Sequence, residues 1–362
     1  MSEMRELLIE NASKVFSDLC KDQAYTKAEN GEWNPYLWKV LDDNGFPDAT
    51  RTPERGGPGS DLGDALAIIR AAGGFCLPAP LAETMLAELG MAAAGFEPRK
   101  GVATVGPVIL DDRCTIERNG SGWSLFGTAR RIPWARHADY IVLLADAGGH
   151  RATVIAPSMG TLIPGHNFAN EPRDTIHFDG VQLQEDAVSL RESGLTVMDL
   201  RFYGALFRVA AMTGALEKLL DMTIQYAMER KQFGRPIAKF QAVQQQIAVM
   251  ASQVAAANAA ADAMVEALNS GNAPVEIAAA KARVSEAAGV AAAIAHQIHG
   301  AMGFTLEHPL QRSTRRLWSW RDEFGAEHDW AGWLGDIVVR LGSEGLWPFL
   351  TAELKTPPNL PT

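Results

Sequence analysis

The chain has 362 residues, of which 47% are hydrophobic and 21% charged, a balance typical of a folded globular protein and not of a disordered one. Its net charge of −10 at pH 7 argues against a general nucleic-acid-binding protein. The three cysteines, Cys20, Cys76 and Cys114, have no metal-ligand spacing, so we expect reduced thiols, no metal site and a cytoplasmic location.

The N-terminus and the apolar stretches predict neither a signal peptide nor a membrane span. Residues 1–16 read MSEMRELLIENASKVF, which is amphipathic and acidic, whereas a signal peptide has a basic patch followed by an apolar segment. The alanine-rich run near residue 290 is interrupted by His296, Gln297 and His299. We therefore expect no contact with a membrane.

The first half of the chain changes from a helical to a strand-like pattern near residue 100. Before it, apolar residues recur every three or four positions, as one buried helix face requires, and a Gly- and Pro-rich loop at 52–59 separates such segments. After it, short β-branched runs such as 140–144 are separated by Gly, Asn and Asp. The pair Asn119-Gly120 is typical of a hairpin turn.

Helical periodicity returns from about residue 195. The segment 206–230 keeps a 3.6-residue period, and 244–268 is rich in alanine, which allows close packing in a bundle. The sequence thus predicts an α+β fold in three domains. These are an N-terminal helical domain at 1–101, a middle antiparallel β domain at 102–192 and a C-terminal helical bundle at 193–362.

One segment has the character of a phosphate-binding turn. Residues 226–241 read YAMERKQFGRPIAKFQ, in which a helix carries Arg230 to its end, Gly234 stops the helix and Pro236 begins a new segment. Arg230 and Gln241 would flank one turn and could hold a phosphate between them. On spacing alone, a surface arginine and a helix-capping glycine explain the segment as well.

The same segment resembles the YAxxRxxFGxPIxxFQ signature of the acyl-CoA dehydrogenases. Residues 297–304, QIHGAMGF, are similar to the QxxGGxGF segment of that family, and residues 53–59, PERGGPG, to its PEExGGxG turn. These matches fall in order over nearly the whole chain. The resemblance implies the fold of the family, which consists of a helical domain, a β domain and a four-helix bundle.

The resemblance also implies an FAD site. In the family, the Arg and Phe of the first signature and the Gln of the second hold the adenosine diphosphate half of a neighbouring subunit's FAD. Physically, an arginine would neutralise the pyrophosphate, and a glycine would let the backbone approach it closely. Carried over by position, the cofactor-binding residues are Arg230, Gln232, Phe233, Gln241, Gln297 and Gly300.

The β region departs from the family where the flavin ring and the thioester are usually bound. The usual TEPxAGSD segment has no counterpart at 102–108. The positions that usually supply a Trp and a Thr or Ser beside the ring are Arg131 and Pro133, with Trp134 one residue later. Because proline has no N–H to offer the ring, flavin contact has to differ here.

A dehydrogenase also needs a carboxylate that removes the α-proton while hydride passes to the flavin. One family position for this base corresponds to Gly204. The other, in a YEGT-like turn, corresponds to Phe324, with Glu323 one residue earlier. Glu323 is therefore the candidate catalytic base. Alternatively, it is a solvated carboxylate paired with Arg315 or Arg316.

Aromatic residues and histidines near this turn carry less specific signals. An aromatic stripe is typical either of a pocket for a bulky, flat acyl group or, more often, of a core or subunit interface. The residues concerned are Trp318, Trp320, Phe324, Trp330 and Trp333. The histidines have no serine or cysteine partner at a hydrolase-like spacing and are assigned structural roles: His296, His299, His308 and His328.

Together, these features predict an FAD-dependent acyl-CoA dehydrogenase component of fatty acid or steroid degradation. It would desaturate an acyl-CoA thioester between Cα and Cβ and pass electrons to an electron-transfer flavoprotein. The residues that would hold the FAD pyrophosphate, which we call the clamp, are kept, whereas the family's usual base and the residues beside the flavin ring are lost. We therefore expect this chain to be the FAD-clamping subunit of a heterotetramer with a homologous acyl-CoA dehydrogenase subunit. Two alternatives remain open: a self-associating, self-sufficient dehydrogenase with Glu323 as base, and a non-catalytic scaffold subunit.

Overall fold

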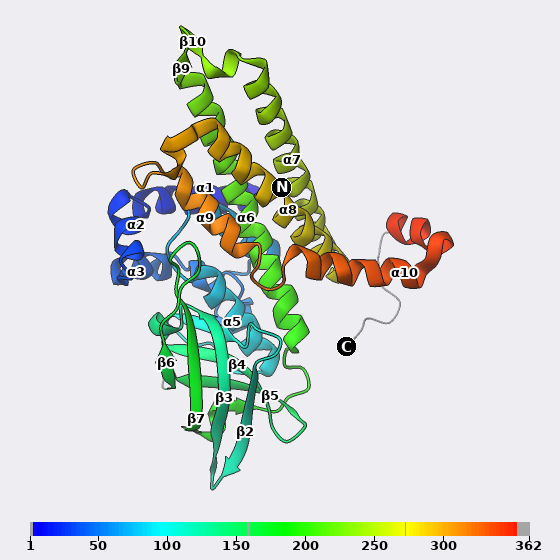
Figure 1. The fold of residues 1–362 in the computed structure, drawn as a ribbon. Helices are drawn as coiled ribbons and strands as arrows, with labels where there is room; N and C mark the ends of the chain where they lie inside the picture. The colour runs from blue at the N-terminus through cyan, green and yellow to red at the C-terminus, as the bar shows by residue number, and fades with distance from the viewer. Residues whose placement is uncertain (1–2, 158–159, 272, 353–362) are drawn as a thin grey trace. The chain divides into compact units, whose positions relative to one another are not determined.

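The computed structural model describes residues 3–157, 160–271 and 273–352 (Figure 1). The chain divides into two compact units that alternate along the sequence. One unit comprises Met1–Phe16, Leu66–Leu77 and Ala205–Thr362, and the other comprises Ser17–Ala65 and Pro78–Gly204. The three-domain boundaries expected from the sequence, at 101 and 192, stay a prediction.

The described elements run from helices through strands back to helices, which confirms the predicted α+β class. The helices are α1 (Glu3–Leu19), α2 (Asp22–Glu29), α3 (Pro35–Asp43), α4 (Leu62–Gly74), α5 (Leu81–Ala94), α6 (Val197–Glu229), α7 (Gln241–Asn269), α8 (Pro274–His299), α9 (Leu310–Trp320) and α10 (Glu327–Thr351). The strands are β1 (Ala103–Gly106), β2 (Arg113–Asn119), β3 (Gly122–Pro133), β4 (Tyr140–Asp146), β5 (Arg151–Pro157), β6 (Thr161–Ile163), β7 (Arg173–Leu183), β8 (Val188–Ser189), β9 (Lys231–Gln232) and β10 (Arg235–Pro236).

Eight strands form one sheet in the order β6-β7-β3-β2-β4-β5-β8, with β1 paired to β4 (Figure 1). The predicted hairpin is present, since β2 and β3 pair up to Asn119 and Gly122 around Gly120, whose φ is 60°. The expectation of a wholly antiparallel sheet is wrong, because β1 and β2 both pair with β4 in parallel. Side chains alternate in the same way in either direction, so the sequence pattern could not distinguish the two arrangements.

The core of the sheet consists of side chains that the strands turn to a common interior. Alternate residues along β2 are buried and exposed, which is the pattern of a strand with one buried face. β4 is buried along nearly all of its length. This core includes Ile116, Leu125, Ile132, Leu143, Val154 and Phe178.

In the helical unit, α4 and α6 meet backbone to backbone. A Cβ added to Gly73 would lie 2.0 Å from the carbonyl oxygen of Ala211, and one added to Gly214 would lie 1.8 Å from that of Arg70. Glycine is therefore required on both helices at this crossing. The alanine-rich helices α7 and α8 lie side by side in the same unit (Figure 1).

Among the described helices, α7 is long and apolar enough to cross a membrane by length and composition, and 28% of its most apolar window is buried in this chain. A packed helix can meet the same criterion. Its buried residues recur at three- and four-residue intervals, from Met250 and Val254 to Ala257 and Ala261. This spacing places them on one face of the helix.

The α4–α6 crossing leads to a test of stability. Gly214→Ala should lower the free energy of unfolding by about 1–3 kcal/mol, because the added methyl group forces the two helices apart. Gly335→Ala is the matched control in α10, where nothing lies within 4 Å of the new Cβ, and it should stabilise by up to about 1 kcal/mol. Chemical denaturation measures both. Equal effects would contradict the close approach of α4 and α6.

Candidate functional site

The first clamp segment is a short hairpin that follows α6. The helix ends at Glu229, and the amide of Arg230 donates to the carbonyl of Tyr226 at 2.9 Å. β9 and β10 then pair antiparallel around a two-residue loop, Phe233-Gly234, in which both φ angles are positive. Such a loop is typical of a tight hairpin. The expectation that Gly234 ends the helix is therefore wrong, because the helix stops earlier and Gly234 forms the turn.

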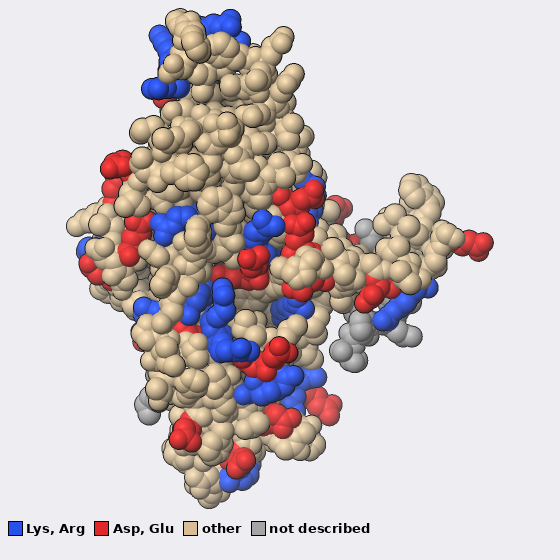
Figure 2. Space-filling view, in the orientation of Figure 1, with Lys and Arg blue, Asp and Glu red and all other residues tan. Residues whose placement is uncertain are grey.

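The predicted cofactor residues are exposed in the single chain. Phe233 at the hairpin turn is 92% exposed. The hairpin and the segment after it carry several exposed cations, which gather over β9 and β10 in Figure 2. These cations are Arg230, Lys231, Arg235 and Lys239. The exposed cofactor candidates are Arg230, Gln232, Phe233, Gln241, Gln297 and Gly300. Exposed cations beside accessible backbone are the groups that bind a pyrophosphate.

The second clamp segment begins where α8 ends. Gly300 has φ 59° and ψ −144°, a conformation that favours glycine, and a Cβ there would find nothing within 4 Å. Tyr226, one turn before Arg230, stacks on His299 with ring centroids 4.3 Å apart, and its hydroxyl donates to the His299 carbonyl at 3.3 Å. The structure thus brings the ends of α6 and α8, and with them both signatures, to one end of the bundle.

The positions expected beside the flavin ring are packed within the β-containing unit. Pro133 ends β3 and pairs with Arg173 of β7. Trp134 has φ 55°, its amide donates to the Pro172 carbonyl at 3.0 Å, and its side chain is buried. Its ring meets Trp33 edge to face at 6.4 Å. Pro133 has no N–H to offer a flavin ring, and the expectation that flavin contact differs here stays a prediction.

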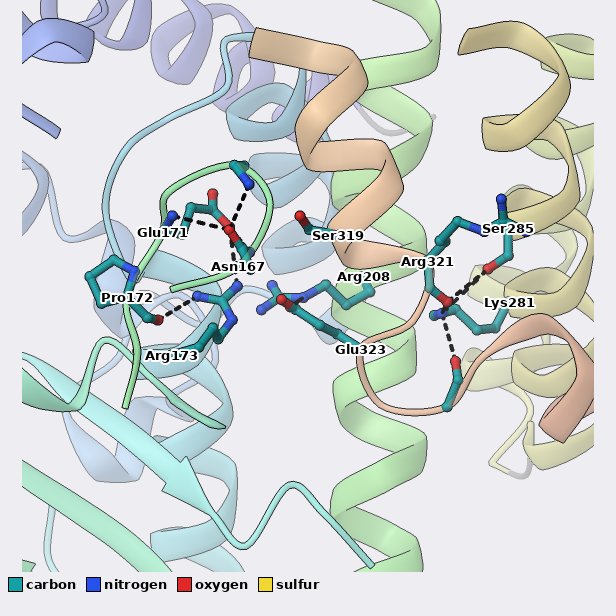
Figure 3. A network of polar contacts seen from close by, with 12 residues as sticks. Asn167, Glu171, Pro172, Arg173, Arg208, Lys281, Ser285, Ser319, Arg321 and Glu323 are labelled. Atoms are coloured by element: carbon teal, nitrogen blue, oxygen red, sulfur yellow. Dashed lines mark hydrogen bonds and ion pairs between the residues drawn. The ribbon is translucent and has the colours of Figure 1, made fainter. Parts of the chain in front are cut away.

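Glu323 lies in the turn after α9 and is buried. Its Oε2 accepts a hydrogen bond from Nε of Arg208, on α6, at 2.7 Å, and the two side chains are 9% and 4% exposed (Figure 3). The alternative of a solvated carboxylate is therefore wrong. The Arg208 guanidinium also lies 5.9 and 5.6 Å from the rings of Trp320 and Phe324, both buried. These two aromatic residues are part of the core.

Lys281 of α8 also binds the turn after α9 that carries Glu323. Its Nζ donates to the carbonyls of Arg321 and Gly325 at 2.7 and 2.9 Å and to Oγ of Ser285 at 3.3 Å (Figure 3). The side chain is completely buried. Burial lowers the pKa of Lys281 to about 7, against the opposing effect of nearby carboxylates, of which Glu323 contributes most.

Sequence reasoning missed Lys281, although a signal was present. The residues three and four positions away on α8, namely Ile277, Ala278, Val284 and Ser285, are apolar or small. A lysine at that position faces the core if the segment is helical. Arg208 gave no comparable signal, because its partner is 115 residues away in the sequence.

The clamp and the Arg208–Glu323 ion pair are separate sites, and the long helix α6 connects them. Arg208 and Arg230 are 22 residues apart, and at 1.5 Å per residue α6 separates them by about 33 Å. The clamp residues are exposed, whereas Glu323 is paired with Arg208 and only 9% of its side chain is exposed.

Comparison with known proteins agrees with this geometry. The family model for the acyl-CoA dehydrogenase C-terminal domain matches residues 192–321. Acyl-CoA dehydrogenase IpdE2 of Mycolicibacterium smegmatis is 29% identical over 327 residues, which cover 87% of this chain and 93% of the relative. The crystal structure of the ChsE4-ChsE5 complex from Mycobacterium tuberculosis gives a TM-score of 0.86 at 19% identity, covering 95% of this chain and 99% of that chain. The Tcur3481-Tcur3483 steroid ACAD variant gives 0.83 at 21% identity, covering 93% and 98%.

The matching domain model, the full-length relative and the shared fold define the class of protein. Residues 192–321 form an acyl-CoA dehydrogenase C-terminal domain, and over most of its length the chain is similar to acyl-CoA dehydrogenases, which are FAD-dependent oxidoreductases of acyl-CoA thioesters.

The buried lysine leads to a prediction on pH. An unfolded lysine keeps its proton up to pH 10.5, whereas Lys281 loses it near pH 7, so the unfolded chain binds more protons between these values. This group therefore makes stability rise with pH across that window. Lys281→Met should remove up to about one proton from the difference in proton binding between the unfolded and folded states, so that stability rises less steeply with pH. Lys218→Met, at an exposed position of α6, is the control. Urea denaturation from pH 7 to 10 measures both, and an unchanged slope in Lys281→Met contradicts the assignment.

Proposed function

We propose that this chain is the FAD-clamping subunit of a heteromeric acyl-CoA dehydrogenase, and that a homologous subunit supplies the catalytic base and the flavin-ring wall. The observation that carries the proposal is the exposure of the clamp. All six cofactor candidates are exposed in the single chain, at elements that contribute cations and open backbone. Exposed groups of this kind suit a cofactor that is shared with a second subunit.

The residues of the clamp suit the adenosine diphosphate half of FAD. Arg230 would pair with the pyrophosphate, while the open backbone at Gly300 would allow a phosphate or ribose to approach. Phe233 offers an exposed ring for apolar contact. When bound, FAD supplies the hydride acceptor for α,β-desaturation of the acyl-CoA thioester, and an electron-transfer flavoprotein would receive the electrons.

The buried site argues against a base in this chain. Glu323 is held by Arg208, and it would have to give up that partner before it could accept a substrate proton. The other family position is Gly204, which has no side chain to act as a base. The partner subunit would therefore remove the α-proton. The self-sufficient alternative needs Glu323 to leave Arg208 during turnover.

Similar proteins support a heteromer and a bulky acyl group. One solved structure of the same fold is the ChsE4-ChsE5 complex, and another is described as a steroid ACAD with two chain names. By analogy, we propose a ring-containing, steroid-derived acyl-CoA as the substrate class and a homologous subunit as the partner.

Flavin content tests the clamp. Co-expressed with its partner, the chain should carry FAD at about one per two chains in a heterotetramer. Arg230→Ala should weaken FAD binding about 10- to 150-fold, because one charge-assisted contact to pyrophosphate contributes about 1.5–3 kcal/mol. Arg118→Ala is the control, since this arginine is exposed on β2 and already paired with Glu185. Absorbance, solution mass and FAD titration are the measurements.

Three results would contradict the proposal. Unchanged FAD affinity in Arg230→Ala would remove Arg230 from the clamp. One FAD per chain in a homo-oligomer would favour the self-sufficient dehydrogenase. A partner-bound chain that never contains FAD would favour the scaffold subunit.

Glu323→Gln separates the two enzymatic possibilities. The variant should lose stability by about 3–5 kcal/mol, because it leaves Arg208 buried without its carboxylate. Its turnover in the assembled enzyme should stay within a few-fold of the wild type at a temperature where both are folded. The double variant Arg208→Gln/Glu323→Gln is the matched control for the uncompensated charge. A fall in kcat by 1,000-fold or more with FAD still bound would identify Glu323 as the base.

A further inference from the structure

The clamp rests on a group of buried and half-buried rings that the proposed function does not use. Tyr226 and His299 are stacked, with ring centroids 4.3 Å apart at an angle of 26°. His308 meets the His299 ring nearly edge to face at 4.9 Å and the Tyr226 ring at 6.1 Å. Tyr226 also donates to the carbonyl of His299, the peptide that leads directly into Gly300. The stack therefore joins the two clamp segments.

The turn formed by residues Gly300–Phe304 packs against His296 and His299. A Cβ added to Gly303 would lie 3.0 Å from the Cβ of His299 and 3.3 Å from Nδ1 of His296. The ring of Phe304, which is largely exposed, stacks on His296 at 4.2 Å. The end of the turn at Gly303 and Phe304 is thus packed against these histidines.

Each histidine has one ring nitrogen in a hydrogen bond, which is compatible with a neutral imidazole. Nδ1 of His299 donates to the carbonyl of Ala295 at 2.8 Å, which leaves Nε2 as the acceptor nitrogen. His296 shares a hydrogen bond with Oγ1 of Thr314 at 2.9 Å through Nε2. The remaining atoms, Nε2 of His299 and Nδ1 of His296, are buried and have no hydrogen-bond partner among the described residues. His299 as a whole is 3% exposed.

A second proton on His299 would have no hydrogen-bond acceptor close by among the described residues. The titratable groups that face His299 are His296 from α8, Tyr226 from α6 and His308 from the segment before α9. Around His296, α9 contributes the Thr314 hydroxyl and a tryptophan ring. Burial lowers the pKa of His299, His296 and His308, and the other two histidines lower that of His299 further.

We propose that Tyr226 and His299 are positioning residues of the FAD clamp, and that the clamp holds FAD only while the imidazole of His299 is neutral. An imidazolium at His299 places an N–H without an acceptor under the Gly300–Phe304 turn and repels its neighbours. Because the pKa of His299 lies below its ordinary value, the ordered turn is favoured above that pKa and is lost as the pH falls through it. The inference rests on the proposed function, since it concerns the same clamp.

FAD titration of the assembled apoprotein tests the proposal, with flavin fluorescence as the readout between pH 7.5 and 5.5. The wild-type Kd should rise about tenfold toward the acid end, since one proton would be taken up on release. Tyr226→Phe, which keeps the stacked ring and loses the hydroxyl, should raise the Kd about 2- to 10-fold at pH 7.5. His299→Phe keeps an aromatic ring that cannot titrate, so its Kd should change little with pH.

His328→Gln is the matched control, because this histidine is 84% exposed on α10 and its substitution should leave the wild-type pH profile unchanged. A wild-type pH profile in His299→Phe would overturn the proposal, as would an unchanged Kd in Tyr226→Phe. If His299→Phe does not fold, as judged by near-UV circular dichroism, the Tyr226→Phe result and the wild-type pH profile decide. Absence of FAD binding by the wild-type complex at any pH would instead overturn the proposed function itself.

Discussion

The helical unit depends on the backbone contact between α4 and α6, because that contact leaves no freedom to slide or rotate the longest helix. A Cβ at Gly73 or Gly214 would overlap a carbonyl of the opposite helix, so the two backbones fit together in one register. Arg208 precedes this crossing on α6 and Arg230 follows it. One rigid helix therefore sets the position of both the buried ion pair and the clamp.

Burial of charge gives the two sites opposite characters. Two basic side chains, Arg208 and Lys281, bind the turn that carries Glu323: Arg208 pairs with the Glu323 carboxylate, and Lys281 donates to two carbonyls of the turn. Such an arrangement is a constraint more than a source of stability, since removing any one member leaves another charge or carbonyl without its partner. A carboxylate fixed in this way suits a structural role. The exposed clamp has no such constraint and can adapt to a ligand.

Local patterns predicted most of the secondary structure, and long-range contacts account for what they missed. The hairpin at Asn119-Gly120 follows from turn chemistry, which acts over a few residues. The parallel pairing of β1 with β4 has no local signal. The signatures identified the clamp candidates, but no sequence pattern linked Glu323 to Arg208 or placed Lys281 behind the turn. Those relations exist only once three helices have packed.

Buried contacts under the clamp have to hold its two segments in place. Exposed cations on a short hairpin are weakly packed, and a side chain as exposed as Phe233 adds little rigidity. The buried contacts that fix the two segments relative to each other include the Tyr226–His299 stack and the rings that adjoin it. The free nitrogens of His296 and His299 are buried without a hydrogen-bond partner in the described part of the chain, so a proton there would be an N–H without an acceptor. A clamp that is preorganised by neutral histidines is therefore sensitive to acid, although none of the ligand-facing candidates titrates near neutral pH.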